Sequence, residues 1–134
     1  MPANPRPSRR TYVQGVSLRI DFKDCASVFR AGVRTCVPAG CFSDVLITDE
    51  FSPLDPEGGH QRKYNAPGVG VIRVGAAGGV DPETLRLTSV ARLCGSALAK
   101  VRALAVKQDR RSYSVAPDVM GSAPPAKHTL RAGC

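Results

Sequence analysis

The sequence has no tryptophan, only four phenylalanines and three tyrosines, and no hydrophobic run long enough to cross a bilayer. With so few aromatic side chains, the core must be built largely from alanine and valine, which bury little area each, so we expect it to be small. The first ten residues are basic and rich in proline, and they lead into no apolar segment, so the sequence as written shows no signal peptide. These absences favour a soluble protein without a transmembrane segment.

The charge of the chain is strongly positive and unevenly distributed. The formal net charge is +8, and residues 94–134 hold seven Lys or Arg against two Asp or Glu, which is +5 of that total. A basic excess favours polyanions such as nucleic acid, because Lys and Arg neutralise phosphates and release counterions. A compositional bias toward Arg, Ala, Gly, Pro and Val explains the same excess without a partner. We therefore expect at most weak, non-specific polyanion binding.

Period-two alternation of apolar residues predicts strands along the first two thirds of the chain. One strand is expected at Val16–Ile20, followed by a polar turn at Asp21–Asp24. The segments Val28–Val37 and Phe42–Phe51 alternate on both sides of Pro38-Ala39-Gly40 and predict an antiparallel hairpin.

The sequence Ala66-Pro67-Gly68-Val69 fits a type II turn, since Pro67 fixes φ near −65° and Gly68 accepts a positive φ. We expect strands at Arg62–Ala66 and Val69–Val74 on its two sides. A further strand at Glu83–Leu93, with Leu85 and Leu87 inward, is expected to pair with Val69–Val74 through a loose connection at Gly75–Gly79.

Helical spacing of Leu98, Val101, Leu104 and Ala105 predicts a short amphipathic helix from about Gly95 to Gln108. The expected organisation is a flexible basic arm (1–10), an antiparallel β-domain (11–93), an amphipathic basic helix (94–108) and a flexible tail (109–134). The fold class is mainly β: an antiparallel meander, forming a sandwich or partial barrel, with a short C-terminal helix and disordered termini.

Four sequence segments occur in order: VPAGCFSDVL from Val37, SPLDP from Ser52, YNAPGVG from Tyr64, and ETL to SV between Glu83 and Val90. Over residues 11–92 the chain resembles uncharacterised bacterial β-domains, mostly secreted or lipoprotein-anchored, that carry VPAG-x-F-x-D and Y-x-APGVG motifs. The resemblance implies an antiparallel β-domain of unknown function behind an export signal. The missing export signal and upstream strands suggest a truncated or diverged member, which would be extracytoplasmic if the chain is a fragment of an exported protein.

Cys36 and Cys41 lie on opposite arms of the expected hairpin, where cross-strand neighbours fall within disulfide reach. We predict a bridge between them only in an oxidising compartment; otherwise they are two small, partly buried residues. A zinc site built from these two cysteines, Cys25 and His60 is disfavoured, since no second Cys-x-x-Cys is present.

Candidate catalytic groups are few. Five carboxylates cluster in sequence, but catalysis by a pair of them needs two in one cleft, and neighbours on a strand point to opposite faces. They are Asp44, Asp49, Glu50, Asp55 and Glu57. His60 is interpreted as a solvated loop histidine and His128 as a tail residue. No catalytic, cofactor or metal residues are predicted.

Two functions remain open, and an enzyme has less support than either. The first is a non-enzymatic β-domain that binds an unknown ligand or is an envelope-associated structural module. The alternative is a small basic nucleic-acid-associated protein, which would use the basic residues of the arm and the helix. These are Arg6, Arg9, Arg10, Lys100, Arg102, Lys107, Arg110 and Arg111. The expected core positions of the aromatic residues disfavour this alternative, because sheet-based binders of single strands need exposed rings.

Overall fold

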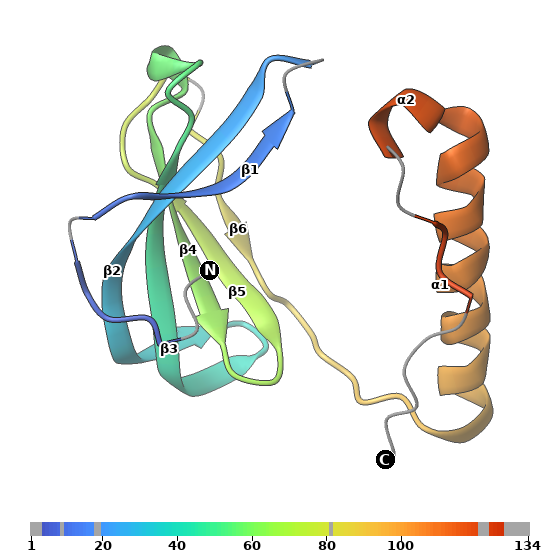
Figure 1. Cartoon of the computed structure of the whole chain (residues 1–134). Coiled ribbons are helices and arrows are strands. Elements are labelled where there is room, and N and C mark those ends of the chain that lie inside the picture. Colours follow the sequence, from blue (N-terminus) through green and yellow to red (C-terminus); the bar gives the residue numbers. More distant parts are fainter. Residues whose placement is uncertain (1–3, 9, 18–19, 81, 121–123, 128–134) are drawn as a thin grey trace. The chain divides into compact units, whose positions relative to one another are not determined.

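A computed structural model of the chain describes residues 4–8, 10–17, 20–80, 82–120 and 124–127. The chain divides into two compact units, Met1–Val90 and Ala91–Cys134. The first unit contains a single open sheet, and the second unit contains helices (Figure 1).

The sheet is a six-stranded antiparallel meander in which every strand pairs with its neighbours in sequence (Figure 1). This confirms the predicted antiparallel meander, in the form of one open sheet. The strands are β1 (Tyr12–Ser17), β2 (Phe22–Val37), β3 (Gly40–Phe51), β4 (His60–Ala66), β5 (Gly70–Ala76) and β6 (Leu85–Arg86), with a short 3₁₀ turn, η2 (Pro56–Gly58), between β3 and β4.

The predicted hairpin between Val28–Val37 and Phe42–Phe51 is confirmed as the long β2–β3 pair, with Val28 opposite Thr48 and Cys36 opposite Cys41. Strand β2 starts earlier than expected, at Phe22, so the predicted polar turn at Asp21–Asp24 is wrong beyond Asp21. Asp21 itself has a φ of 47°, which reverses the chain ahead of β2.

Register shifts bend this hairpin. The pairing of β2 with β3 is irregular between Arg30 and Val33, where Gly32 has a φ of 69°, and again between Val33 and Thr35, opposite Asp44 with a φ of 55°. An extra residue on one strand of an antiparallel pair kinks that strand and increases its twist. The bends allow side chains from β2, β3 and β5 to meet in one small core.

The segment Ala66-Pro67-Gly68-Val69 joins β4 to β5 in a tight turn. The Val69 N–H donates to the Ala66 carbonyl at 3.2 Å, and Gly68 has a φ of 71°. These are the features of a type II turn, in which the third residue needs a positive φ.

The last strand is much shorter than the predicted Glu83–Leu93, because β6 covers only Leu85–Arg86. It pairs with β5 as expected, with Leu85 opposite Val74. Leu87 packs against the core as predicted, whereas Leu85 is exposed at the sheet edge. The Leu87 backbone bonds to Ile72 on β5 and, through its carbonyl, to Ala39 in the β2–β3 turn.

Strand β1 also differs from expectation, since it spans Tyr12–Ser17 rather than Val16–Ile20. Ile20 lies in the turn before β2 and is exposed, and Leu18 lies outside the described residues. The preceding segment is not free of the sheet, because the Ser8 N–H donates to the Val28 carbonyl at 3.0 Å. The expected flexible arm is therefore attached to β2 at this residue.

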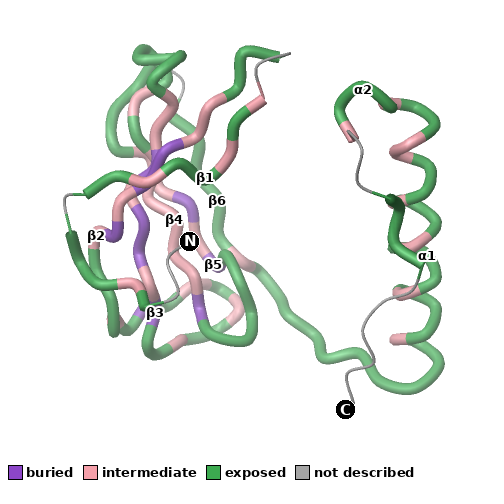
Figure 2. Tube along the Cα trace, viewed as in Figure 1, coloured by how far each residue is buried: buried purple, intermediate pink, exposed green. Residues whose placement is uncertain are grey.

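The core of the sheet unit is small, as the composition predicts. Val45, Ile47, Ala66 and Ile72 form its buried centre (Figure 2). Partly buried side chains surround them, namely Phe29, Val33, Val37, Phe42, Tyr64 and Leu87.

The second unit contains α1 (Gly95–Val115) and α2 (Pro117–Met120). Helix α1 continues well past the predicted end at Gln108, so Asp109–Val115 are helical and not part of a flexible tail. None of the residues of either helix is buried (Figure 2). The Ala126 N–H donates to the Asp109 carboxylate at 2.6 Å, which attaches the chain after α2 to α1.

Candidate functional site

Polar side chains from four strands meet on one face of the sheet. The register places Ala26, Glu50 and Gln61 opposite one another across β2, β3 and β4, and Val28, Thr48 and Lys63 in the next row. Residues directly opposite each other in a sheet share a face, so Glu50, Thr48 and Lys63 project to the same side. That side carries buried charge.

Glu50 is the centre of this polar group and is only 7% exposed. Its carboxylate forms an ion pair with Lys63 Nζ at 2.7 Å and accepts a hydrogen bond from Thr48 Oγ1 at 2.6 Å. Burial alone would raise the pKa of Glu50, but hydrogen bonds from Lys63, Thr48 and Gln14 outweigh it and lower the pKa. Glu50 is therefore ionised at neutral pH.

Lys63 is the matching cation. Burial would lower the pKa of its ammonium group, but the hydrogen bond and charge of Glu50 raise it, with further support from Asp24 and Glu83. Glu50 and Lys63 thus each stabilise the charged form of the other.

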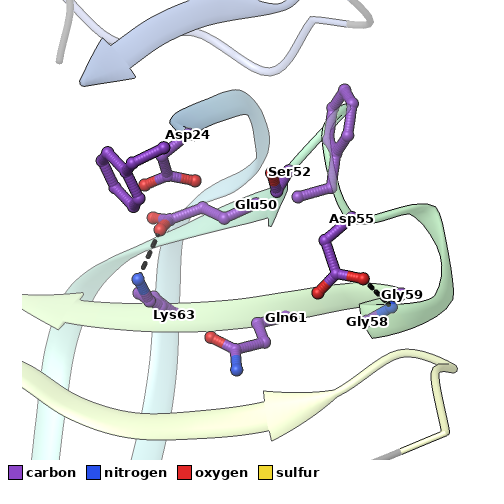
Figure 3. Close-up of a pocket in the computed structure, with 10 residues that line it drawn as sticks. Asp24, Glu50, Ser52, Asp55, Gly58, Gly59, Gln61 and Lys63 are labelled. Carbon is purple, nitrogen blue, oxygen red and sulfur yellow. Dashed lines mark hydrogen bonds and ion pairs between the residues drawn. The ribbon is translucent and has the colours of Figure 1, made fainter. Parts of the chain in front are cut away.

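Asp24 on β2 lies beside Glu50 (Figure 3). Burial and then the negative charge of Glu50 raise the pKa of Asp24, while Lys63 and the backbone N–H of Cys25 act in the opposite direction. The pKa of the Tyr12 phenol is raised by burial and by the same two carboxylates. Its hydroxyl has no hydrogen-bond partner among the described residues. Negative charge is thus in excess around this group.

A cleft of about 300 Å³ opens above these residues. Figure 3 shows Glu50 and Lys63 in contact at its centre, with Asp55 at the end nearer η2. Asp55 accepts a hydrogen bond from the Gly58 N–H at 3.1 Å. The charged and aromatic side chains that line the cleft are Asp24, Glu50, Asp55, Lys63, Phe22 and Phe51.

A second polar cluster lies around Asp49, whose neighbours differ from those of Glu50, as expected for adjacent residues on a strand. His60 Nδ1 lies 3.0 Å from Asp49 Oδ2, and its ring stacks on Phe51 at 4.8 Å between centroids. Arg62 lies over the Phe29 ring at 3.9 Å. His60 therefore begins β4, so its expected position in a loop is wrong, whereas its side chain is exposed to solvent as interpreted.

The sequence-predicted carboxylates do not form one site. Glu50 and Asp55 line the same cleft, whereas Asp49 pairs with His60. Asp44 lies at a bend of β3, and the Glu57 carbonyl in η2 accepts the Val80 N–H. Among the described residues, no group of three or more His, Cys, Asp or Glu could hold a metal ion.

Cys36, Cys41 and Cys25 form one disulfide bridge and one free thiol. A disulfide joins Cys36 to Cys41 across the end of the β2–β3 hairpin, with their Cα atoms 4.0 Å apart. Two of the three sulfurs that the zinc hypothesis would use are therefore occupied. Cys25 is a buried free thiol on β2. His128 and Arg9 lie outside the described residues.

Sequence reasoning missed Asp24 and Lys63. The sequence pattern predicts a turn at Asp24 and gives Lys63 no role. The sequence carries no clear signal for them, because the alternation of Thr48 and Glu50 on β3 is also typical of a solvated face, and only the structure shows that this face is buried.

Comparisons with models of known protein families, with curated proteins and with solved structures find no match to this chain. None of the helices in the described part of the chain is long and apolar enough to span a membrane.

Proposed function

We propose that the sheet unit is a non-enzymatic binding module and that the Glu50 cleft is its binding site for a ligand carrying an ammonium or guanidinium group. The observation that carries this proposal is the cleft of about 300 Å³ built around a charged side chain that is only 7% exposed. Burying charge is costly, and a fold gains little from it compared with apolar residues of the same volume. A retained buried charge therefore favours a role in recognition.

The sign of the ligand follows from the charges in the cleft. Lys63 neutralises one carboxylate, that of Glu50, at 2.7 Å. Asp24 and Asp55 add further negative charge along the same cleft. Phe22 also lines it, and an aromatic ring attracts cations through its negative face. Carboxylates beside an aromatic ring suit an organic cation.

A binding role is supported over catalysis by how Glu50 and Lys63 are held. Each stabilises the charged form of the other, because the pKa of Glu50 is lowered and that of Lys63 is raised. General acid–base catalysis works best when the pKa of the group lies near the working pH. The pKa values of Glu50 and Lys63 are both shifted away from neutral pH.

An extracytoplasmic location is part of the proposal. The resemblance over residues 11–92 to exported β-domains supports it, and so does the disulfide between Cys36 and Cys41, since disulfides persist in oxidising compartments. An envelope-associated module would meet cationic groups on peptides and polyamines there.

The test is an NMR titration of the full chain with arginine amide and with citrulline amide as the uncharged control of the same shape, both acetylated on the α-amino group so that only the guanidinium carries charge. We expect arginine amide to shift the amide signals of Gln61, Lys63 and Ser52, and citrulline amide to leave them in place. Equal shifts with both compounds, or shifts confined to the second unit, would contradict the proposal.

A second candidate, weak binding of nucleic acid, is favoured by one feature of α1. Lys100, Lys107 and Arg111 are exposed and separated by seven and four residues, so they form one stripe along the helix. A basic stripe on an exposed helix can neutralise phosphates without reading bases.

The test for this candidate is fluorescence anisotropy with a labelled single-stranded oligonucleotide at several salt concentrations. Replacing the three stripe residues by Gln should flatten the salt dependence, while Asp24→Asn should leave it unchanged. Tight binding of one sequence at physiological salt would promote this function above the first.

A further inference from the structure

We infer that β1 is a homodimer interface, in which the free edge of β1 pairs antiparallel with β1 of a second copy of this chain. The two edges of the open sheet are β1 and β6. The β1 edge has six residues and the β6 edge has two, so the longer edge offers the larger row of unpaired backbone groups. This inference does not depend on the proposed ligand.

The β1 edge carries a register shift between Val13 and Gly15, but it lacks the two strongest chemical barriers to pairing, which are charge and proline. Tyr12–Ser17 contains no charged residue and no proline, whereas charges and proline are the usual protection of an exposed edge. The segment before it does not cover the edge, since Ser8 bonds to Val28 and so follows β2. The outer backbone of β1 is left for a partner.

The side chains of β1 favour a second copy as that partner. Val13 and Val16 are 54% and 59% exposed. A register shift between Val13 and Gly15 lets both valines share a face, because Val13 lies opposite Cys25 and Val16 opposite Lys23 on β2. In a two-fold pair centred between Gln14 and Gly15, each Val13 meets the Val16 of the other copy. The same contact forms twice.

Pairing of β1 with the β6 edge of another copy is disfavoured. Such a head-to-tail contact would not close and would form fibres. Strand β6 has only Leu85–Arg86 to offer, and Arg86 adds charge to that edge. Two copies of a chain with a net charge of +8 repel each other, and pairing through β1 adds no further repulsion at the contact because β1 carries no charged residue.

The experiment is sedimentation velocity of the full chain over a wide range of protein concentration. We expect a reversible dimer that dissociates on dilution, which an adventitious intermolecular disulfide would not do. The double variant Val13→Lys/Val16→Lys should remain monomeric with an unchanged far-UV circular dichroism spectrum. The matched control is Val80→Lys, at a residue that is 79% exposed and away from β1, and it should dimerise like the wild type.

A second measurement keeps the test decisive if the double variant fails to fold. Hydrogen exchange of the wild-type Tyr12–Ser17 amides should become slower as the concentration rises. A wild-type chain that stays monomeric throughout, amide exchange independent of concentration, or a folded double variant that still dimerises would each overturn the inference.

Discussion

The two units of this chain are held together in different ways. The sheet unit builds its core from residues distant in sequence, so that Val45 on β3 and Ile72 on β5 are both 0% exposed. Helix α1 has no buried residue along its 21 positions. A helix gains one hydrogen bond for each residue that it fixes, whereas a sheet needs chain segments far apart to meet. Among the described residues, the cleft with buried charge lies in the sheet unit.

This difference predicts where the protein is sensitive to change. Substitutions in the sheet should affect stability through packing and through the Glu50–Lys63 pair. Substitutions on the helix should act on charge and little else.

The largest effect is expected from Ile72→Ala. Removing this fully buried side chain leaves a cavity and should lower the free energy of unfolding by about 2–5 kcal/mol. The matched change on the helix is Leu104→Ala, at a residue that is 57% exposed, and it should change stability by less than about 0.5 kcal/mol. Urea unfolding followed by circular dichroism measures both. Similar costs at the two sites would remove the contrast between the units.

The next effect concerns the ion pair. Lys63→Met leaves the Glu50 carboxylate buried without its cation and should cost about 2 kcal/mol or more at pH 7. In the wild type the lowered pKa of Glu50 contributes stability above its ordinary pKa of about 4.3, and this is lost as the pH falls through the folded value.

The pH dependence of the variant sharpens this prediction. Without Lys63, burial should raise the pKa of Glu50, so the variant should regain stability as the pH falls through that raised value. Urea midpoints at a series of pH values give the sign. A variant that loses stability on acidification in parallel with the wild type would show that Glu50 is not held by Lys63.

Much of the fold was predictable from local patterns. The β2–β3 hairpin follows from alternation on both sides of Pro38-Ala39-Gly40, and the β4–β5 turn follows from Pro67-Gly68. The lengths of β1 and β6 were not predictable, because an edge strand ends where its single partner stops bonding to it. Helix α1 extends beyond the last residue of its apolar pattern because Gln108, Arg110 and Arg111 have high helix propensity although they are not hydrophobic.

The cleft was hidden from the sequence for a different reason. Asp24, Glu50 and Lys63 come from three strands, and their meeting depends on the register of β2 with β3 and of β3 with β4. Several register shifts interrupt the β2–β3 pairing. A shift of one residue would move Glu50 to the other face, so no reading of single segments could place it.

A smaller effect is expected at the turn. Gly68→Val places a β-branched residue at a φ of 71° and should cost at least about 1 kcal/mol. A Cβ at this residue would meet no atom within 4 Å, so the cost is one of backbone strain and not of contact. An unchanged denaturant midpoint would contradict this account of the turn.

The smallest effect on the sheet should come from removing the second unit. A chain ending at Val90 should keep the β-sheet signal in far-UV circular dichroism and unfold within about 0.5 kcal/mol of the full protein, because α1 buries no residue. Loss of the sheet signal would show that the two units depend on each other.

The central claim is that the cleft is retained for binding and not for stability, and Asp24→Asn tests it most directly. The raised pKa of Asp24 means that its ionised form is disfavoured in the folded state, mainly by burial and then by Glu50. Its contribution to stability is therefore unfavourable above the folded pKa and is relieved as the pH falls through it. The uncharged variant should escape this penalty at pH 7.

The measurement combines the thermal midpoint at pH 7 with arginine amide titration of the same samples. We predict that Asp24→Asn raises the midpoint and weakens arginine amide binding. A variant with a lower midpoint and unchanged binding would show that Asp24 supports the fold and not the ligand, and would contradict the account.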